Sequence, residues 1–206
     1  MCVIVYKPDG VSSNWTDLFS CWAANGDGAG VMWSDGSFIR FRKGFMSWKA
    51  MNDWYDDNIL GNELMYRVAF HFRIKTHDPI SPNLCHPFVI REEQLLMMHN
   101  GVLGISCVDQ SESDTSTYAK MLSRFEPEFI MNEMIDFIES TTVGNKLLFM
   151  DQQGNVRITK YDLWHKSGDI LYSNQNWKFQ VFNDSPTHKW MRNNSRKSYR
   201  CTALDN

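Results

Sequence analysis

A cysteine directly follows the initiator methionine, and an apolar run from Val3 to Tyr6 directly follows that cysteine. Initiator methionine is normally trimmed when the second residue is small, so Cys2 would then carry both a thiol and a free α-amine. A thiolate is a strong nucleophile, and an α-amine with a pKa of about 7.7–8.0 can take up its proton. The first six residues therefore suggest a nucleophile at the edge of a buried strand, although Met-Cys also begins many chains that have no such chemistry.

Three other polar stretches carry side chains that can bind or polarise a substrate. They are Arg73-Ile74-Lys75-Thr76-His77, the pair His86-Pro87 with His99-Asn100-Gly101, and Ser113-Asp114-Thr115. Each stretch also has a purely structural interpretation. Asn-Gly between two apolar runs is a strong hairpin signal, Ser113 or Asp114 is a natural helix N-cap, and residues 75–87 have the composition of a long loop. Spacing alone leaves both interpretations open.

The composition is that of a globular protein without an extreme charge. The chain has 206 residues, of which 43% are hydrophobic and 14% aromatic, enough for one large domain or two small ones. A net charge of −3 predicts no general electrostatic attraction to nucleic acid. A membrane span needs about 18 consecutive apolar residues, and no segment has that many. Five cysteines without CxxC spacing, and no signal-peptide pattern, predict free thiols in a cytoplasmic protein.

The elements that must position these residues follow from periodicity and turn signals. Strands are predicted at 3–6, 31–33, 37–41, 65–74, 94–99, 102–108, 146–150, 156–159 and 169–172, and helices at 15–22, 47–57, 116–125 and 128–140. Their mixed order, with many hairpins, favours antiparallel sheets with helices outside. One domain over residues 1–183 is predicted to precede a basic polar tail at 184–206, which would be a solvated terminus or a docking segment for an acidic partner.

In their order along the chain, these motifs resemble those of the class II glutamine amidotransferase domain, an N-terminal-nucleophile (Ntn) hydrolase. The resemblance covers residues 2–172 and rests on Cys after Met, Asp27-Gly28-Ala29-Gly30, Arg-x-x-Thr-His, His-Pro, His-Asn-Gly and Ser-Asp-Thr. It implies an α+β fold, a four-layer αββα sandwich of two mainly antiparallel sheets with helices outside. It also implies that L-glutamine is hydrolysed to glutamate and ammonia, without cofactor or metal, and that the ammonia passes to a separate synthase.

The resemblance assigns catalytic roles to three residues that match the motifs. Cys2 would be the nucleophile, and its α-amine would carry the proton to the leaving ammonia. Asn100 and Gly101 would donate hydrogen bonds to the oxyanion, one through the side-chain amide and the other through the backbone N–H.

The resemblance also assigns substrate-binding roles. Arg73 offers a planar fork to the α-carboxylate of glutamine, and Asp114 offers a negative charge to its α-ammonium. Thr76 and His77 would line the glutamine pocket, and His86 would lie on the loop that covers it. Together these partners would select a free amino acid as substrate.

Three positions depart from the family pattern and put efficiency or substrate choice in doubt. Ala24 occupies the place where many members have an arginine, Lys75 replaces a small residue, and Asp78 follows His77 where glycine is usual. Two alternatives therefore stay open: an Ntn amidohydrolase of another γ-glutamyl or acyl amide, and a degenerate binding or regulatory module. A metal site is not indicated, because no His or Cys pair has zinc-finger or HExxH spacing.

Overall fold

The computed structural model describes residues 1–75, 80–106 and 112–178, which form two sheets with helices on their outer faces. In the six-stranded sheet the order is β3 (Ile39–Phe45), β2 (Ala29–Ser34), β4 (Arg67–Phe72), β1 (Val3–Lys7), β10 (Ile170–Tyr172) and β9 (His165–Ser167). The four-stranded sheet has the order β5 (Phe88–Arg91), β6 (Leu95–Asn100), β7 (Lys146–Asp151) and β8 (Val156–Ile158). Every strand pair in both sheets is antiparallel.

Five α-helices and three short 3-10 helices complete the described part of the chain. The helices are α1 (Trp15–Ala24), α2 (Trp48–Asn58), α3 (Asp114–Leu122), α4 (Pro127–Asn132) and α5 (Ile135–Thr141), with 3-10 turns η1 (Leu60–Met65), η2 (Pro82–Leu84) and η3 (Tyr161–Leu163). The first three helices begin with side-chain caps from Asn14, Ser47 and Ser113. No helix among the described residues is long and apolar enough to cross a membrane.

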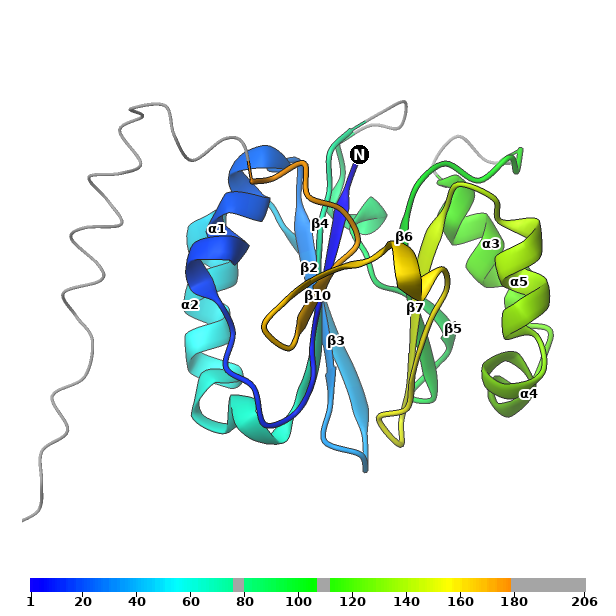
Figure 1. The fold of residues 1–206 in the computed structure, drawn as a ribbon, viewed down its shortest axis with the longest axis horizontal. Coiled ribbons are helices and arrows are strands. Elements are labelled where there is room, and N and C mark those ends of the chain that lie inside the picture. Colours follow the sequence, from blue (N-terminus) through cyan, green and yellow to red (C-terminus); the bar gives the residue numbers. More distant parts are fainter. Residues whose placement is uncertain (76–79, 107–111, 179–206) are drawn as a thin grey trace, which may run out of the picture.

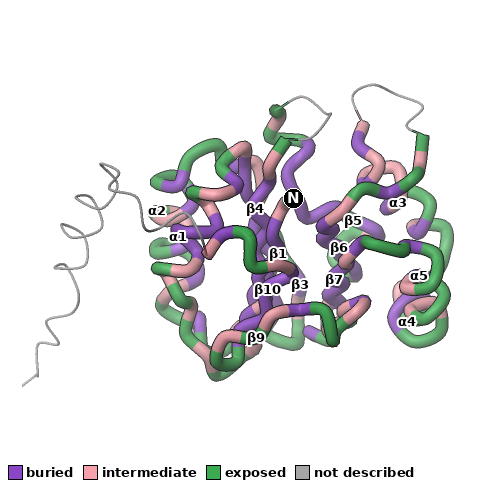
Figure 2. The backbone as a smooth tube through the Cα atoms, turned by 45° about the horizontal axis from the view of Figure 1, so that its top comes forward, coloured by how far each residue is buried: buried purple, intermediate pink, exposed green. Residues whose placement is uncertain are grey.

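The alternation of side chains along each strand produces the layers. Val3 and Val5 of β1 face the helices α1 and α2, while Ile4 between them faces the other sheet. In β7, Leu147 and Phe149 pack against α3–α5, and the intervening residues of β6 and β7 meet the six-stranded sheet. Strands buried on both faces lie in the middle of the molecule, with one helical layer on each side (Figures 1 and 2).

The predicted α+β fold with two antiparallel sheets and outer helices is confirmed, and several element predictions are wrong in detail. Residues 102–106 of the strand predicted at 102–108 form no strand, and residues 107 and 108 lie outside the described part. The helix predicted at 128–140 is two helices, because the amides of Glu133 and Met134 both bond to the carbonyl of Phe129 and end α4. Strands β5 and β9 were not predicted. The predicted boundary at residue 183 and the basic tail lie outside the described residues.

A buried lysine fixes the far end of β1, the strand that begins at the candidate nucleophile. The Lys7 side chain is 1% exposed, and its ammonium donates to the carbonyl oxygens of Glu63 at 2.6 Å, Val11 at 2.7 Å, Tyr66 at 2.9 Å and Pro8 at 3.1 Å. A buried ammonium is tolerated only when oxygen atoms replace its hydration shell. Lys7 therefore ties β1, the turn after it and η1 together.

We expect Lys7→Met to lower the free energy of unfolding by about 3 kcal/mol, because it leaves several carbonyl oxygens without their donor. Urea titration followed by circular dichroism measures this change. The matched control is Lys49→Met, which removes only an exposed ion pair with Asp53 and should change stability by less than about 0.5 kcal/mol. Equal effects of the two substitutions would contradict the role given to Lys7.

Candidate active site

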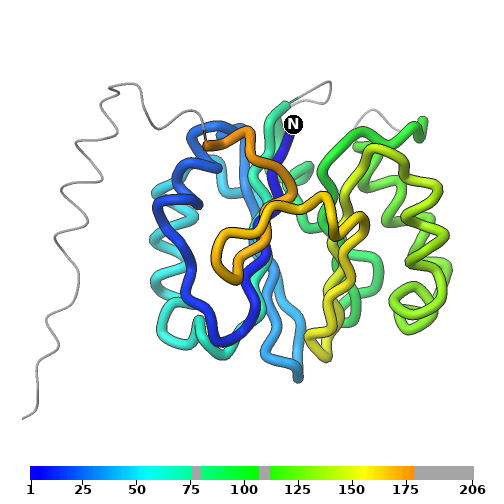
Figure 3. The backbone as a smooth tube through the Cα atoms, viewed as in Figure 1, coloured from blue at the N-terminus to red at the C-terminus, as the bar shows by residue number. Residues whose placement is uncertain are grey.

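A cavity of about 230 Å³ opens where β1, β4 and β6 end or begin at the same edge of the two sheets. Of the residues to which the sequence assigned a catalytic or binding role, five line it: Cys2, Arg73, His86, Gly101 and Asp114. They come from stretches far apart in the chain that meet at the end of the molecule where the N-terminus lies (Figure 3). The apolar part of its wall comes from Ile74, Leu84, Val102, Leu103 and Ile105.

Cys2 lies beside Ile74, the residue after Arg73. Its Sγ accepts a hydrogen bond from the Ile74 amide at 3.4 Å and lies 3.6 Å from the Ile74 carbonyl oxygen. Burial raises the pKa of the Cys2 thiol above its ordinary value, against the opposing effects of the Ile74 amide, the N-terminal ammonium and Arg73. A thiol with a raised pKa is protonated near neutral pH, so its use as a nucleophile requires a base close by.

Arg73 directly follows β4 and brings a positive charge to the cavity wall. Its backbone is fixed on both sides, since its amide donates to Gly28 O at 2.8 Å and its carbonyl accepts from Asp27 N at 3.0 Å. The residue is only 5% exposed, and Nη1 has no hydrogen-bond partner among the described residues. A buried guanidinium with an unused donor favours an anionic ligand.

Asp114 is the first residue of α3 and supplies the negative charge across the same cavity. Oδ2 accepts from the Leu103 amide at 2.7 Å, and Oδ1 accepts from the Thr115 amide at 2.6 Å. The Thr115 hydroxyl lies 3.1 Å from Oδ1. Because Leu103 N–H bonds to Asp114, the apolar run after Gly101 lines the cavity instead of continuing the sheet.

Asn100 is the last residue of β6 and Gly101 follows it, but only Gly101 lines the cavity. Gly101 lines the cavity with φ at +149°, and a Cβ there would lie 2.1 Å from Asn145 Oδ1. Asn100 is 4% exposed and lies behind the cavity wall, where Nδ2 donates to Ser173 Oγ at 2.9 Å and Oδ1 has no partner among the described residues. One of the two amide hydrogens of Asn100 is therefore engaged by Ser173, and Asn100 is not among the residues that line the cavity.

Three histidines form a buried group between the sheets. The rings of His71 and His86 stack with centroids 3.8 Å apart, and His99 lies 6.4 Å from His86. Burial lowers the pKa of His71 to about 3 and holds those of His86 and His99 below their usual value, so all three are uncharged near neutral pH. In the described part of the chain, no group of three or more His, Cys, Asp or Glu residues is placed to hold a metal ion.

The stretch Asp27-Gly28-Ala29-Gly30 packs closely against Cys85 and His86, next to the cavity. A Cβ on Gly30 would lie 1.8 Å from the His86 carbonyl oxygen, and one on Gly28 would lie 2.6 Å from Cys85 Sγ. Asp27 Oδ2 accepts from the Lys75 amide at 2.7 Å. The stretch follows the end of α1, and its glycines permit a close backbone approach. Thr76, His77 and Asp78 lie outside the described residues.

Some residues around the site were given no catalytic or binding role from the sequence. Ser173 accepts from Ile4 N at 2.8 Å as well as from Asn100, and Asn174 Nδ2 donates to the Cys2 carbonyl at 2.6 Å. Asn145 bonds to His99 from the turn after α5. No motif spacing marks these residues, because their contacts depend on which strand ends become neighbours in the folded chain.

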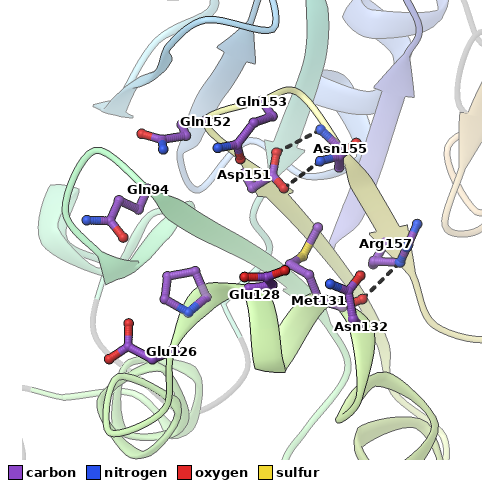
Figure 4. Close-up of a pocket in the computed structure, with 11 residues that line it drawn as sticks. Gln94, Glu126, Glu128, Met131, Asn132, Asp151, Gln152, Gln153, Asn155 and Arg157 are labelled. Atoms are coloured by element: carbon purple, nitrogen blue, oxygen red, sulfur yellow. Dashed lines mark hydrogen bonds between the residues drawn. The ribbon is translucent and has the colours of Figure 1, made fainter.

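A larger cavity, of about 580 Å³, lies at the opposite end of the four-stranded sheet (Figure 4). It is lined by residues of α4 and of the β7–β8 turn, among them Glu126, Glu128 and Asp151. Asp151 is already bonded to the amide and side chain of Asn155 at 2.8 and 2.9 Å. Because this cavity holds no histidine or cysteine, the smaller cavity beside Cys2 is the candidate active site.

Comparison with known proteins bears on the fold. No family model matches the chain, and no curated protein matches its sequence. Among solved structures it is similar to glutamine phosphoribosylpyrophosphate (PRPP) amidotransferase from B. subtilis, complexed with ADP and GMP, with 16% sequence identity and a TM-score of 0.51. The match covers 84% of this chain and 41% of that one. The similarity is one of fold, and it agrees with an Ntn-hydrolase arrangement of two antiparallel sheets.

We expect Gly101→Ala to lower the free energy of unfolding by at least about 2 kcal/mol, because a side chain there is strained by the positive φ and overlaps Asn145. The matched control is Gly104→Ala in the same loop, where a Cβ meets nothing within 4 Å. That substitution should change stability by less than about 0.5 kcal/mol. Chemical denaturation of both variants measures the difference, and a Gly101→Ala protein as stable as the control would contradict the described turn.

Proposed function

We propose that this protein is a class II-type glutamine amidotransferase that hydrolyses L-glutamine to glutamate and ammonia at Cys2. The observation that carries the proposal is the meeting of three groups in one cavity: a thiol, a buried guanidinium with an unused donor, and a carboxylate. A free amino acid needs an anion-binding and a cation-binding partner, and Arg73 and Asp114 offer both. The fold similarity to an amidotransferase supports the same reaction class.

The proposed reaction begins after Met1 has been removed. The α-amine of Cys2 accepts the thiol proton, and Sγ attacks the side-chain amide carbon of glutamine. In this proposal the Gly101 N–H and the second Nδ2 hydrogen of Asn100 stabilise the negative oxygen of the tetrahedral intermediate. The C–N bond then breaks, the α-ammonium returns its proton to the leaving nitrogen, and ammonia departs. Water hydrolyses the remaining thioester, which releases glutamate and restores the thiol.

The surroundings of Cys2 explain why its own amine would be the base. Burial raises the pKa of the thiol, so few thiolates exist near neutral pH without proton transfer. Burial lowers the pKa of the two histidines that line the cavity, His86 and His99, so neither ring readily takes up a proton. Both nitrogens of His99 are also engaged by Thr115 and Asn145. An α-amine attached to the same residue is already close to the thiol.

The proposal extends to a separate synthase that accepts the ammonia and to a cytoplasmic location. Free ammonia is lost to water unless an acceptor enzyme is close, which motivates the partner. The cysteines of the described part, Cys2, Cys21 and Cys85, are unpaired, as expected in a reducing compartment. Isolation of the tagged protein from its host followed by mass spectrometry tests the partner, and recovery of the chain alone under mild conditions would count against it.

Activity should require a free amine on Cys2. A fusion protein whose protease site ends immediately before Cys2 allows the residue to be exposed by cleavage. We expect glutamate release after cleavage, none from cleaved Cys2→Ala, and at least about 100-fold less from a matched protein cleaved to leave one glycine before Cys2, because the base is then displaced. Intact mass verifies each N-terminus. Equal activity with the extra glycine would contradict the α-amine as base, and inactivity of all forms would favour a binding or regulatory module.

The two charged anchors should act mainly on substrate binding. We expect Arg73→Lys and Asp114→Asn each to raise the KM for glutamine by about 10–100-fold with a smaller change in kcat, because each removes a charge-assisted hydrogen bond. Arg40→Lys at an exposed position is the matched control and should leave both constants unchanged. If both anchor variants keep the wild-type KM, and an acyl amide without α-amino and α-carboxyl groups is cleaved equally well, the protein is another Ntn amidohydrolase.

A further inference from the structure

Cys2 is held between the residues that follow β4 and β10, the two strands beside β1 in its sheet. On the β4 side, its Sγ accepts a hydrogen bond from the Ile74 amide at 3.4 Å. On the β10 side, its carbonyl oxygen accepts from Asn174 Nδ2 at 2.6 Å. Because a peptide group is planar, a fixed carbonyl also fixes the Cα of Cys2. Asn174 and Ile74 therefore hold the Cα end and the sulfur end of the candidate nucleophile.

The side chain of Asn174 has a defined orientation. Oδ1 accepts from the Asn176 amide at 3.0 Å, in the turn that asparagine and aspartate commonly form with the residue two positions later. Since Oδ1 is engaged there, the atom that faces the Cys2 carbonyl is the donor Nδ2. The Asn174 carbonyl accepts from the indole N–H of Trp177 at 3.0 Å, and Trp177 packs into the core. The donor to Cys2 thus belongs to a turn that is anchored in the core.

The residue before Asn174 connects this turn to β1 and to the second sheet. Ser173 N donates to the Ile4 carbonyl at 2.9 Å, and Ile4 N donates to Ser173 Oγ at 2.8 Å. The ammonium of Lys146, the first residue of β7, donates to the Ser173 carbonyl. Asn174 therefore cannot move away from Cys2 unless several of these hydrogen bonds break.

The turn by itself does not require asparagine at position 174. An aspartate would accept from the Asn176 amide equally well, but its second oxygen would face the Cys2 carbonyl and could not donate to it. A carboxylate would also bring a negative charge to within about 6 Å of the α-amine, because the nitrogen and the carbonyl oxygen of one residue lie about 3 Å apart. Asparagine serves both the turn and Cys2 without adding a charge.

We propose that Asn174 is a positioning residue that directs Cys2 toward the cavity through its carbonyl, and that its neutral amide leaves the α-amine free to accept the thiol proton. This inference rests on the proposed glutaminase function. The amine and the thiol belong to one residue, so the orientation of that whole residue decides whether Sγ meets the substrate carbon. Asn174 does not line the cavity, and it therefore acts on the reaction only through Cys2.

Several charged or titratable groups surround the candidate nucleophile. They are Arg73 after β4, Cys85 and His86 before β5, His99 on β6 and Asp114 at the start of α3. These groups are the same in every variant described below, so they contribute equally to each pH profile. A carboxylate at position 174 would favour the protonated α-ammonium and raise the pKa of the amine. The base would then become available only at higher pH.

The test compares Asn174→Asp with Asn174→Ser in the full-length protein with a free Cys2. The aspartate keeps the turn to Asn176 and adds the charge, whereas the serine can form a similar turn but lacks both the amide donor and the charge. Asn176→Asp adds the same charge at an exposed position two residues later and serves as the matched control. Urea titration shows whether each variant folds, and glutaminase assays at a series of pH values give kcat and KM.

We expect Asn174→Asp to lower kcat about tenfold or more and to shift the acidic side of the kcat/KM profile, where activity rises with pH, upward by at least about 0.5 pH units. Asn174→Ser should lower kcat similarly without this shift. KM should change less than about twofold in both variants, because Arg73 and Asp114 are intact. Asn176→Asp should behave as the wild type.

Two results with an active wild type would overturn the inference alone. One is an unchanged kcat in Asn174→Ser, which also decides the question if Asn174→Asp does not fold. The other is a profile of folded Asn174→Asp that does not shift, or that shifts no further than that of Asn176→Asp. A wild type without glutaminase activity would overturn the proposed function and the assigned role with it.

Discussion

The position of Cys2 depends on the hydrogen bonds that Ser173 and Asn174 make to the start of β1. Ser173 exchanges hydrogen bonds with Ile4 through both its hydroxyl and its backbone, at 2.8 and 2.9 Å, and Asn174 bonds to the Cys2 carbonyl at 2.6 Å. On the other side of β1, the pairing of Val3 with Phe72 places Cys2 at the level of the residues after β4. A terminal residue that would otherwise fray is held between two strands.

The same serine connects this anchor to the candidate oxyanion site. Ser173 Oγ accepts from both Ile4 N and Asn100 Nδ2, so β1 of one sheet and the end of β6 in the other share a single acceptor. The two sheets thus meet through hydrogen bonds at this edge and through apolar side chains across the layer between them. The candidate nucleophile and the proposed oxyanion donor are therefore linked through one acceptor, and electrostatic stabilisation of a transition state requires this kind of rigidity.

Much of the fold follows from local sequence rules. The wrong predictions concern segments whose local pattern is compatible with two different structures. Strands predicted at 3–6 and 146–150 lie where expected, and the helices predicted at 15–22 and 47–57 follow the caps Asn14 and Ser47. An apolar run can line a cavity as well as enter a sheet, which is why the strand predicted at 102–108 is wrong. Likewise, the continuous apolar pattern at 128–140 does not reveal the break at Met134, which depends on how α4 and α5 pack.

The residues of the candidate site also differ in how far the sequence predicts them. Arg73, Gly101 and Asp114 belong to short motifs, so their meeting at Cys2 could be anticipated once the motifs were considered in order. Asn145 belongs to no motif, and its hydrogen bond to His99 comes only from the register that brings the start of β7 beside the end of β6. Residues that touch a substrate are constrained by its chemistry and so repeat as recognisable patterns, whereas residues that hold them in place are constrained only by geometry. For this reason a sequence reveals the groups that react sooner than the hydrogen bonds that orient them.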